Sequence, residues 1–365
     1  MSFEKVGFIG LGLIGGSIAK TIKKKYPDTT LIATARHADT IQEAHNFGTI
    51  ENDTLLPLSD FADCDYIFLC TPVQQNLIYL KELKSVIKPP CIITDVGSVK
   101  SDIHKAVTAL DMEANFIGGH PMCGSEKTGF FNATEYLLEN AYYIITPTAK
   151  TTPAQLEDFH ALVKSLGSVP MILDYEKHDF ATAAISHLPH IIASSLVNLV
   201  SDLDDEQETM RTIAAGGFKD ITRIASSSPV MWQNICLSNQ EQILKLTDCY
   251  IHALQNIRSS VADAKSDDII SFFQSAKDYR DSITTPVRGS LQKNYSVYCD
   301  LVDEAGAIAT LATIMASHNI SIKNIGILHN REYEDGVLQI EFYEEDALEK
   351  AVKLMEDNHY VVHRR

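Results

Sequence analysis

One short motif near the N-terminus constrains this chain more than any other feature. The segment VGFIGLGLIGGS carries Gly10, Gly12 and Gly15 at the spacing GxGxxG. It follows a β-type run and begins a helical one, which is the context of a dinucleotide-binding loop. The first glycine permits a tight turn, the second lets a pyrophosphate approach the backbone, and the third lets helix and strand pack closely. The amide groups and dipole of a helix N-terminus favour phosphate. We therefore predict a cofactor site made by Gly10, Gly12, Leu13, Ile14 and Gly15.

Cofactor choice is predicted from the end of the second β-type run. An acidic residue usually stands there in NAD-binding chains and binds the ribose 2′-hydroxyl, whereas an arginine suits a 2′-phosphate. Here the segment reads TARH and ends with Arg36-His37, without an acid. NADP is therefore favoured over NAD, although either cofactor remains open, and Arg36 has the plainer interpretation of a surface charge. Thr71 and Pro72, which follow the third β-type run, are also assigned to the cofactor site.

Up to residue 175, short apolar β-type runs alternate with helical ones. This alternation is typical of a mostly parallel sheet that helices cover on both faces. The fold predicted for residues 1–175 is an α/β Rossmann-type nucleotide-binding domain. Its predicted strands are 6–9, 31–35, 66–70, 91–94, 115–117, 141–146 and 170–173.

Two further domains are predicted downstream. Residues 176–283 carry apolar residues at helical spacing, almost all round in FATAAISHLPHIIASSLVNLV. Such helices need burial, so we predict an all-α dimerisation domain that packs against a second copy of the chain. After a linker at 284–295, residues 296–365 show the order βαββαβ, which predicts a small ferredoxin-like domain.

Composition limits the partners and the compartment. The 31 basic and 48 acidic side chains give a net charge of −17, which repels nucleic acid and anionic membranes. An anionic substrate would therefore need a local cationic pocket. The seven cysteines are scattered without a CxxC pair, as expected of reduced thiols in a cytoplasmic enzyme. We find no run of 18 apolar residues and expect no membrane span.

Four stretches beyond the glycine loop place polar residues in tight or apolar surroundings. Ser98 and His120 are predicted to follow strands, at the carboxyl edge where open α/β sheets bind ligands. Pro189 removes a backbone donor and should kink its helix, redirecting His187 or His190. The plainer interpretations are structural histidines and solvated charges. A metal site from His120 and Cys123 with the helix histidines lacks a known ligand spacing, so no metal is predicted. The stretches are TDVGSVKSD, GGHPMCGSEKTG, SHLPH and GGFKDITRIASSSPVMW.

In this order, GLGLIGGS, DVGSVK, GGHPMCGSEKTG, SHLPH and GGFKDITRIA…MW resemble the prephenate/arogenate dehydrogenase family of tyrosine biosynthesis, over essentially the full chain. The C-terminal domain is similar to an ACT domain. The resemblance implies NAD(P)-dependent oxidative decarboxylation of prephenate to 4-hydroxyphenylpyruvate, or the same reaction of the amino analogue arogenate. Two different functions also fit a nucleotide-binding loop: another two-domain NAD(P)-dependent dehydrogenase, and an amino-acid or nucleotide sensor. The presence of Ser98, His120 and Arg223 in one chain argues against both.

The resemblance also implies a role for each site residue. His120 hydrogen-bonds the ring hydroxyl of the substrate and acts as base, and Ser98 helps to orient that pair. A neutral imidazole is needed for this step. The rate is therefore expected to fall as pH drops through the histidine pKa, ordinarily about 6.5. For the rest of the substrate, the resemblance assigns Arg223 to a carboxylate, His190, Lys219 and Trp232 to the side-chain end, and Glu126 and Asp220 to pairing with the arginine and gating.

The C-terminal domain carries no constellation of nucleophile and base, which suggests a sensor. ACT-like domains commonly bind amino acids, often between paired copies, and the end product of the pathway is tyrosine. We therefore predict feedback inhibition by L-tyrosine, although a role in dimerisation alone remains open. Three of the predicted effector residues open the first helix of this domain, where a helix N-terminus could receive a carboxylate: Asp303, Ala305 and Gly306. The fourth, Asn319, flanks the next strand and could supply a side-chain hydrogen bond.

Overall fold

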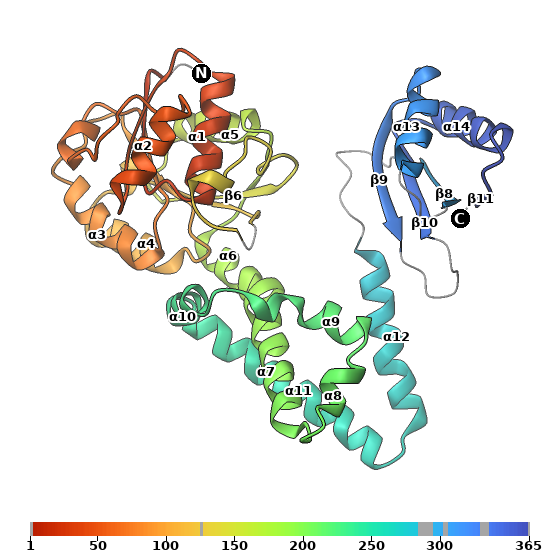
Figure 1. Ribbon diagram of the computed structural model, residues 1–365. Coiled ribbons are helices and arrows are strands. Elements are labelled where there is room, and N and C mark those ends of the chain that lie inside the picture. Colours follow the sequence, from red (N-terminus) through yellow and green to blue (C-terminus); the bar gives the residue numbers. More distant parts are fainter. Residues whose placement is uncertain (1–2, 125–126, 284–294, 302–305, 329–335, 364–365) are drawn as a thin grey trace. The chain divides into compact units, whose positions relative to one another are not determined.

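The structure is a computed structural model that describes residues 3–124, 127–283, 295–301, 306–328 and 336–363. The chain divides into two compact units, Met1–Asp268 and Ile269–Arg365. Each unit is described by itself below, with elements labelled as in Figure 1.

The first unit begins with the predicted α/β domain. Four parallel strands lie in the order β2-β1-β3-β4: β1 (Lys5–Ile9), β2 (Thr30–Thr34), β3 (Tyr66–Leu69) and β4 (Ile92–Asp95). Three more continue the domain: β5 (Ile117–Pro121), β6 (Tyr142–Pro147) and β7 (Val169–Ile172). β5 is antiparallel to β6, which is parallel to β7, and a parallel bridge between Ile93 and Phe116 links β4 to the start of β5. The prediction of a mostly parallel sheet is confirmed.

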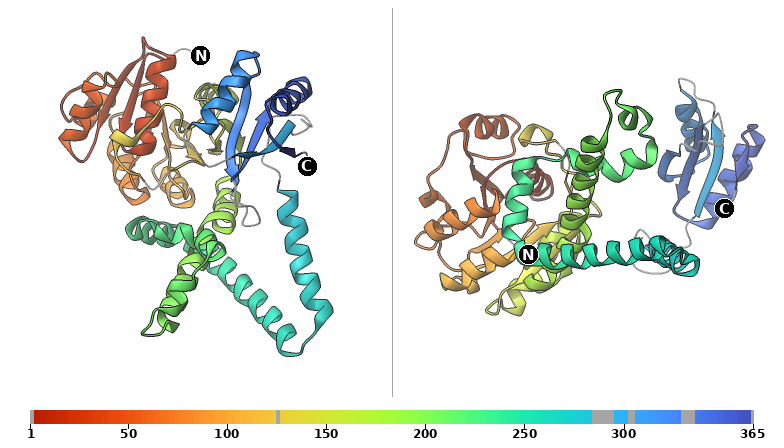
Figure 2. Two further views of the ribbon diagram at one scale, coloured as in Figure 1. Left: turned by 45° about the vertical axis from the view of Figure 1, so that its right-hand side comes forward. Right: turned by 90° about the horizontal axis from the view of Figure 1, so that it is seen from below.

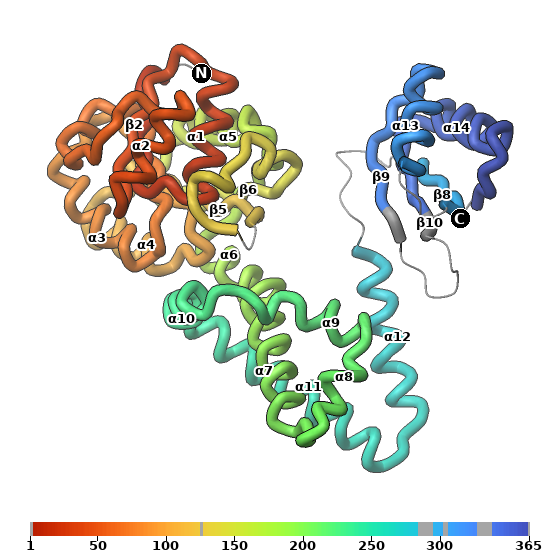
Figure 3. The backbone as a smooth tube through the Cα atoms, in the orientation of Figure 1, coloured from red at the N-terminus to blue at the C-terminus, as the bar shows by residue number. Residues whose placement is uncertain are grey.

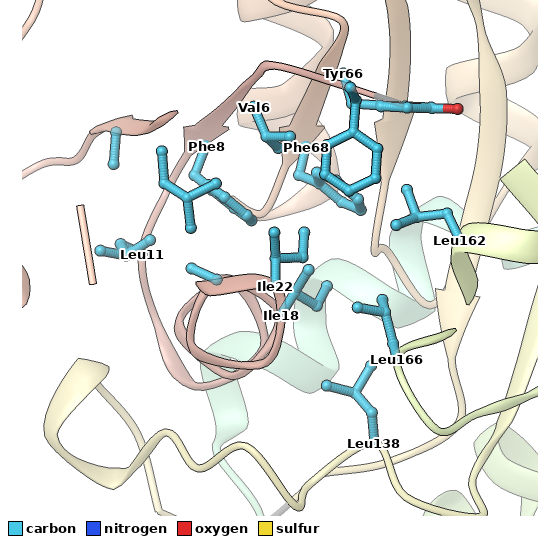
Figure 4. Packing of buried hydrophobic residues seen from close by; sticks show 14 of the residues in the cluster. Val6, Phe8, Leu11, Ile18, Ile22, Tyr66, Phe68, Leu138, Leu162 and Leu166 are labelled. Carbon is cyan, nitrogen blue, oxygen red and sulfur yellow. The ribbon is translucent and has the colours of Figure 1, made fainter. Parts of the chain in front are cut away.

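Helices cover both faces of this sheet, because successive strand residues alternate between two apolar clusters. In β3, Tyr66 and Phe68 join the cluster under α1 and α5, whereas Ile67 and Leu69 join the one under α3 and α4. Figure 4 shows the first cluster, with Ile18 of α1 packed below the strand residues. The helices are α1 (Leu13–Lys25), α2 (Ala38–Asn46), α3 (Val73–Leu83), α4 (Ser101–Ala109) and α5 (Pro153–Ser165), with 3₁₀ turns at Leu58–Phe61, Glu113–Asn115 and Phe130–Asn132.

The helical domain begins with one continuous helical path, which Figure 3 traces from α6 into α7. The irregularity predicted at Pro189 is a π-helical turn at Ala183–His187, which ends two residues before the proline. A proline has no N–H for the carbonyl four residues earlier, and a π turn accommodates that loss. The helices are α6 (Tyr175–Thr182), α7 (Leu188–Leu203), α8 (Thr209–Ile213), α9 (Gly216–Thr222), a 3₁₀ turn at Arg223–Ser226, α10 (Pro229–Ser238), α11 (Gln240–Ala262) and α12 (Ser266–Ser282). The last of these crosses the boundary between the two units.

Large apolar side chains of the helical domain are exposed in the single chain. In α11, which crosses α7 (Figures 1 and 2), Leu244, Ile251, Leu254 and Val261 are each 46–60% exposed. Their spacing of seven, three and seven places them on one face. Among the described residues, the helical segment Tyr175–Leu203 is long and apolar enough to cross a membrane by length and composition. We expected no membrane span. One such helix is weak evidence for a span, because the core helix of a soluble protein passes the same test.

The second unit contains the predicted βαββαβ order, which is confirmed. Its sheet is antiparallel in the order β11-β8-β10-β9. Buried side chains such as Cys299, Leu311, Ile340 and Met355 form a core between the sheet and its two helices. Most of the predicted linker, residues 284–294, lies outside the described residues, and Tyr295 already begins a strand. The elements are β8 (Tyr295–Leu301), α13 (Ala307–Ser317), β9 (Ile322–Leu328), β10 (Gly336–Phe342), α14 (Glu345–Asp357) and β11 (Val362–His363).

Candidate active site

The glycine loop has the geometry that its sequence predicts. Gly10 has a φ of +93°, and a Cβ there would lie 2.7 Å from Cγ2 of Thr71. A Cβ on Gly15 would lie 2.6 Å from the carbonyl oxygen of Gly10. A Cβ on Gly12 would meet nothing within 4 Å, in open space directly before the first turn of α1. The residues thus fit a dinucleotide, because the space in front of a helix N-terminus is left free for a phosphate.

The other predicted cofactor residues lie at the carboxyl ends of neighbouring strands. Leu13 and Ile14 are half-buried in the first turn of α1. Thr71 follows β3, where its side chain hydrogen-bonds Asn76, and Pro72 precedes α3. Arg36 follows β2 and is exposed just before α2. The parallel strands therefore bring these residues to one edge of the sheet.

His120 reaches the same edge, but from within a strand. Our prediction ended the fifth strand at residue 117 and placed His120 in the loop beyond it, whereas β5 runs through Ile117–Pro121. The Gly118-Gly119 pair permits this, because a Cβ on Gly119 would lie 2.7 Å from the carbonyl oxygen of Asp95. Ser98 lies half-buried three residues beyond the end of β4, as predicted. Gly119 therefore serves close packing of β5 against β4, whereas a Cβ on Gly118 would collide with Oγ1 of Thr146 in β6.

A buried ion pair fixes the backbone beside His120. The Nζ of Lys100 donates to the carboxylate of Asp95 and to the carbonyl oxygen of Gly119, the latter at 2.8 Å. Oδ1 of Asp95 accepts from the N–H of Gly119 at 3.3 Å. Both charged side chains are at most 1% exposed. Burial lowers the pKa of Lys100, and the adjacent carboxylate of Asp95 opposes that shift. The backbone of Gly119 is thus hydrogen-bonded at both its N–H and its carbonyl group.

His120 itself hydrogen-bonds a second histidine that sequence reasoning missed. Nδ1 of His120 lies 2.8 Å from Nε2 of His178, and Nδ1 of His178 lies 2.8 Å from Oδ1 of Asp179. Asp179 also accepts the backbone N–H groups of Lys100 and Ser101 at the start of α4. The only signal was compositional, since Asp179 is the sole carboxylate between Glu176 and Asp202.

Burial and hydrogen bonds shift the pKa values of His120 and Asp179. Burial lowers the pKa of His120 well below the ordinary value, and the neighbouring His178 and Lys100 lower it further. His120 is therefore neutral at pH 7. For Asp179, burial acts to raise the pKa, but the hydrogen bonds from His178, Ser101 and Lys100 outweigh it and the pKa is lowered. Asp179 is therefore ionised.

The helix histidines continue the polar network. Nδ2 of Asn239 donates to the carbonyl oxygen of Asp179 at 2.8 Å and to Nδ1 of His187 at 3.2 Å. His187 is buried, and its ring centroid is 6.0 Å from that of Trp232. The ring of His190 stacks on Trp232 at 3.8 Å. The structure thus links His190 and Trp232 to His120 through a continuous series of contacts.

The predicted charged residues lie elsewhere in the helical domain. Lys219 and Asp220 are exposed on α9. Arg223 is exposed at the 3₁₀ turn that follows α9, and this turn lies against α7. Lys219 lines a hollow of about 570 Å³ between α7, α8 and α9. Glu126 lies outside the described residues. In the part of the chain that the structure describes, no group of three His, Cys, Asp or Glu residues is arranged to hold a metal.

Comparison with known proteins identifies the family. Residues 18–172 match the model of the prephenate dehydrogenase nucleotide-binding domain, and residues 174–275 match that of the prephenate dehydrogenase dimerization domain. The prephenate dehydrogenase of Bacillus subtilis is 39% identical over 95% of this chain and 94% of its own length. The chain belongs to the prephenate dehydrogenase family. A second prephenate dehydrogenase, from Lactococcus lactis, is 34% identical over 97% of this chain and 98% of its own.

Solved structures of the prephenate dehydrogenase family share this fold. Prephenate dehydrogenase from Aquifex aeolicus, in complex with hydroxyphenyl propionate and NAD⁺, superposes with a TM-score of 0.73 and 28% identity, over 78% of this chain and 99% of that one. Arogenate dehydrogenase from Synechocystis gives a TM-score of 0.69 and 30% identity, over 77% of this chain and 100% of that one. The family, the Rossmann-type and helical domains, the oxidoreductase class and a nicotinamide cofactor are thereby confirmed. The assigned site residues remain predictions.

Proposed function

We propose that this chain converts prephenate to 4-hydroxyphenylpyruvate and CO₂ with transfer of hydride to NAD or NADP, and that His120 is the base. One observation carries the proposal. A buried, neutral imidazole lies at the sheet edge that also bears the glycine loop. A general base works best when it is unprotonated at the operating pH and close to the proton that it removes.

The proposed reaction is balanced in atoms and electrons. His120 takes the proton of the ring hydroxyl, and the C4–H bond breaks as C4 becomes a carbonyl carbon. The chemistry supplied by a bound nicotinamide is acceptance of that hydride. Loss of the ring carboxylate as CO₂ leaves its electron pair in the ring, which becomes aromatic. The resulting phenolate oxygen then recovers the proton from His120.

Substrate binding needs positive charge, because prephenate carries two carboxylates and the chain has a net charge of −17. We assign Arg223 to one carboxylate, since a guanidinium can bind it through two parallel hydrogen bonds. His190, Lys219 and Trp232 are assigned to the side-chain end, Ser98 to orientation of His120 and the ring hydroxyl, and Glu126 and Asp220 to pairing with Arg223 and gating entry.

The experiment is a turnover assay of the purified protein with prephenate or arogenate and either cofactor, followed by absorbance of the reduced nicotinamide. We expect turnover of prephenate in wild type, and about 10²–10⁴-fold less in His120→Ala. Dinucleotide affinity, measured by calorimetry, should be unchanged because the glycine loop is intact. Because burial lowers the pKa of His120, the acid limb of the rate should lie below the ordinary histidine value, not at it. Wild-type turnover in His120→Ala would refute the assignment.

The proposal also covers the choice of cofactor, the oligomeric state, the regulation and the location of the protein. The exposed Arg36 supports NADP as cofactor, and the exposed apolar face of α11 supports a homodimer, as does the match to a dimerization domain. L-tyrosine is the proposed feedback inhibitor, acting through the ACT-like second unit. There, Gly306 has a φ of +94° before α13 and Asn319 has a φ of 56° after it, whereas Asp303 and Ala305 lie outside the described residues. Reduced cysteines and a substrate of intermediary metabolism support a cytoplasmic location.

A further inference from the structure

We infer that His178 and Asp179 are positioning residues that hold His120 in the tautomer with Nδ1 protonated and Nε2 free. This inference rests on the proposed role of His120 as base. It assigns a function to the hydrogen-bonded series Asp179–His178–His120, which crosses from the helical domain to the sheet.

The tautomers follow from the donors and acceptors along the series. An ionised carboxylate only accepts, so the proton between Asp179 and His178 belongs to Nδ1 of His178. A neutral His178 then has a lone pair at Nε2 and can only accept there. The ring nitrogen 2.8 Å away, Nδ1 of His120, must therefore carry the donated proton. Nε2 of His120 is left as the basic nitrogen.

The carboxylate of Asp179 does not need a charged His178 as its partner. Its carboxylate accepts the N–H groups of Lys100 and Ser101 at 2.8 and 2.7 Å, at the N-terminus of the nine-residue helix α4. A helix N-terminus stabilises negative charge through these amides and its dipole. The carboxylate is therefore satisfied without an imidazolium beside it. A protonated His178 would instead force His120 to accept at Nδ1 and would block its Nε2 with a proton.

The same arrangement helps once His120 has taken a proton. Its Nδ1–H already points at Nε2 of His178, and the hydrogen bond becomes charge-assisted when the ring turns into an imidazolium. The carboxylate of Asp179 polarises His178 so that Nε2 of His178 becomes a stronger acceptor for the Nδ1–H of His120. No proton has to move along the series, as in triads in which a buried carboxylate orients a histidine without itself being protonated.

A matched pair of substitutions tests the inference. Gln and Met at position 178 have similar length, and neither keeps the imidazole that joins Asp179 to His120. Only Gln offers an oxygen that can accept the Nδ1–H of His120. We expect kcat to fall about 10²–10⁴-fold in His178→Met, and to be at least about tenfold higher in His178→Gln than in His178→Met. A merely structural role, in which the side chain at 178 only fills space beside His120, would lower both variants equally. Equal losses would overturn the inference.

Nitrogen-15 NMR of histidine-labelled protein tests it without turnover. The two ring nitrogens of His120, assigned by comparison with His120→Gln, should show a proton on Nδ1 and none on Nε2. A proton on Nε2 would overturn the inference whatever the substrate. If the expected tautomer is found but neither prephenate nor arogenate turns over, it is the proposed function that fails.

Discussion

The ammonium group of Lys100 lies 2.8 Å from the carbonyl oxygen of Gly119 in β5, and both residues are buried. Lys100→Met should therefore remove the only buried cation paired with Asp95 among the described residues. Loss of one partner of a buried pair typically costs about 3–5 kcal/mol, because the other charge is left uncompensated. Turnover should fall as well, since His120 follows Gly119 directly. Thermal unfolding checks the stability.

The matched control is Lys150→Met. The side chain of Lys150 is 50% exposed, and it pairs with Asp111, which is 79% exposed, and with Glu113, which is 15% exposed. Exposed pairs contribute little, so this variant should melt close to wild type. If Lys100→Met is as stable as Lys150→Met, the buried pair does not hold the strand in place.

Buried histidines should make the fold sensitive to acid. Burial lowers the pKa of His104 and of His187 to about 4 each. Between that value and about 6.5, the unfolded chain binds protons that the folded chain does not. Stability therefore falls as pH drops through this window, by up to about 3 kcal/mol for each histidine. The measurement is the difference in Tm between pH 7 and pH 4.5.

His104→Gln should reduce that difference in Tm. His104 stacks on Tyr175 and bonds Thr146, and it belongs to neither the cofactor nor the substrate assignment. His45→Gln, at an exposed position of α2, is the control and should retain the wild-type difference. An unchanged difference in His104→Gln would assign the acid sensitivity to other groups.

Arg36→Ala should weaken NADP and spare NAD. A hydrogen bond to a charged group contributes about 1.5–3 kcal/mol, or roughly 10- to 150-fold in affinity. Only NADP offers a 2′-phosphate, so NAD serves as the internal control. The check is the ratio of kcat/KM for the two cofactors. A uniform loss would mean that Arg36 does not contact the 2′-phosphate.

Ile251→Asp should convert a dimer to monomers. Ile251 is 46% exposed in the single chain and lies on the apolar face of α11 with Leu244 and Leu254. A carboxylate buried in a subunit interface without a partner is strongly unfavourable. Light scattering after gel filtration gives the mass. Asn256→Asp, on the other side of the helix, should remain dimeric, and a dimeric Ile251→Asp would place the interface elsewhere.

Removal of the chain after Thr285 should abolish inhibition by L-tyrosine while turnover persists. The second unit has its own core, and effector coupling typically amounts to about 1–3 kcal/mol, or roughly 5- to 150-fold in affinity. Tyrosine is titrated against both forms at a fixed prephenate concentration. Equal inhibition of the two would show competition at the active site instead of regulation through the ACT-like domain.

Sequence patterns predicted those structural features that depend on residues close together in the chain. The glycine loop was predicted with its residues because the need for a positive φ at Gly10 and for close approach at Gly15 arises within one turn. The βαββαβ order was predicted because apolar residues recur about every two residues along a strand and about every 3.6 residues along a helix. The end of the fifth strand was wrong, since Gly118-Gly119-His120 reads as a turn. It is held as strand by pairing with Ile144 and Ile145 of β6, which no local pattern reveals.

The sequence by itself determined the family, the order of the domains and the chemistry expected of His120, because these depend on residue types in a fixed order. Only the tertiary structure decided which groups surround that imidazole. His178 is 58 residues away along the chain, and Asp179 bonds backbone groups 78 and 79 residues away. Such contacts are chosen by how the helical domain packs on the sheet edge, and burial there lowers the pKa of His120. Packing, not residue type, therefore makes His120 neutral and orients it.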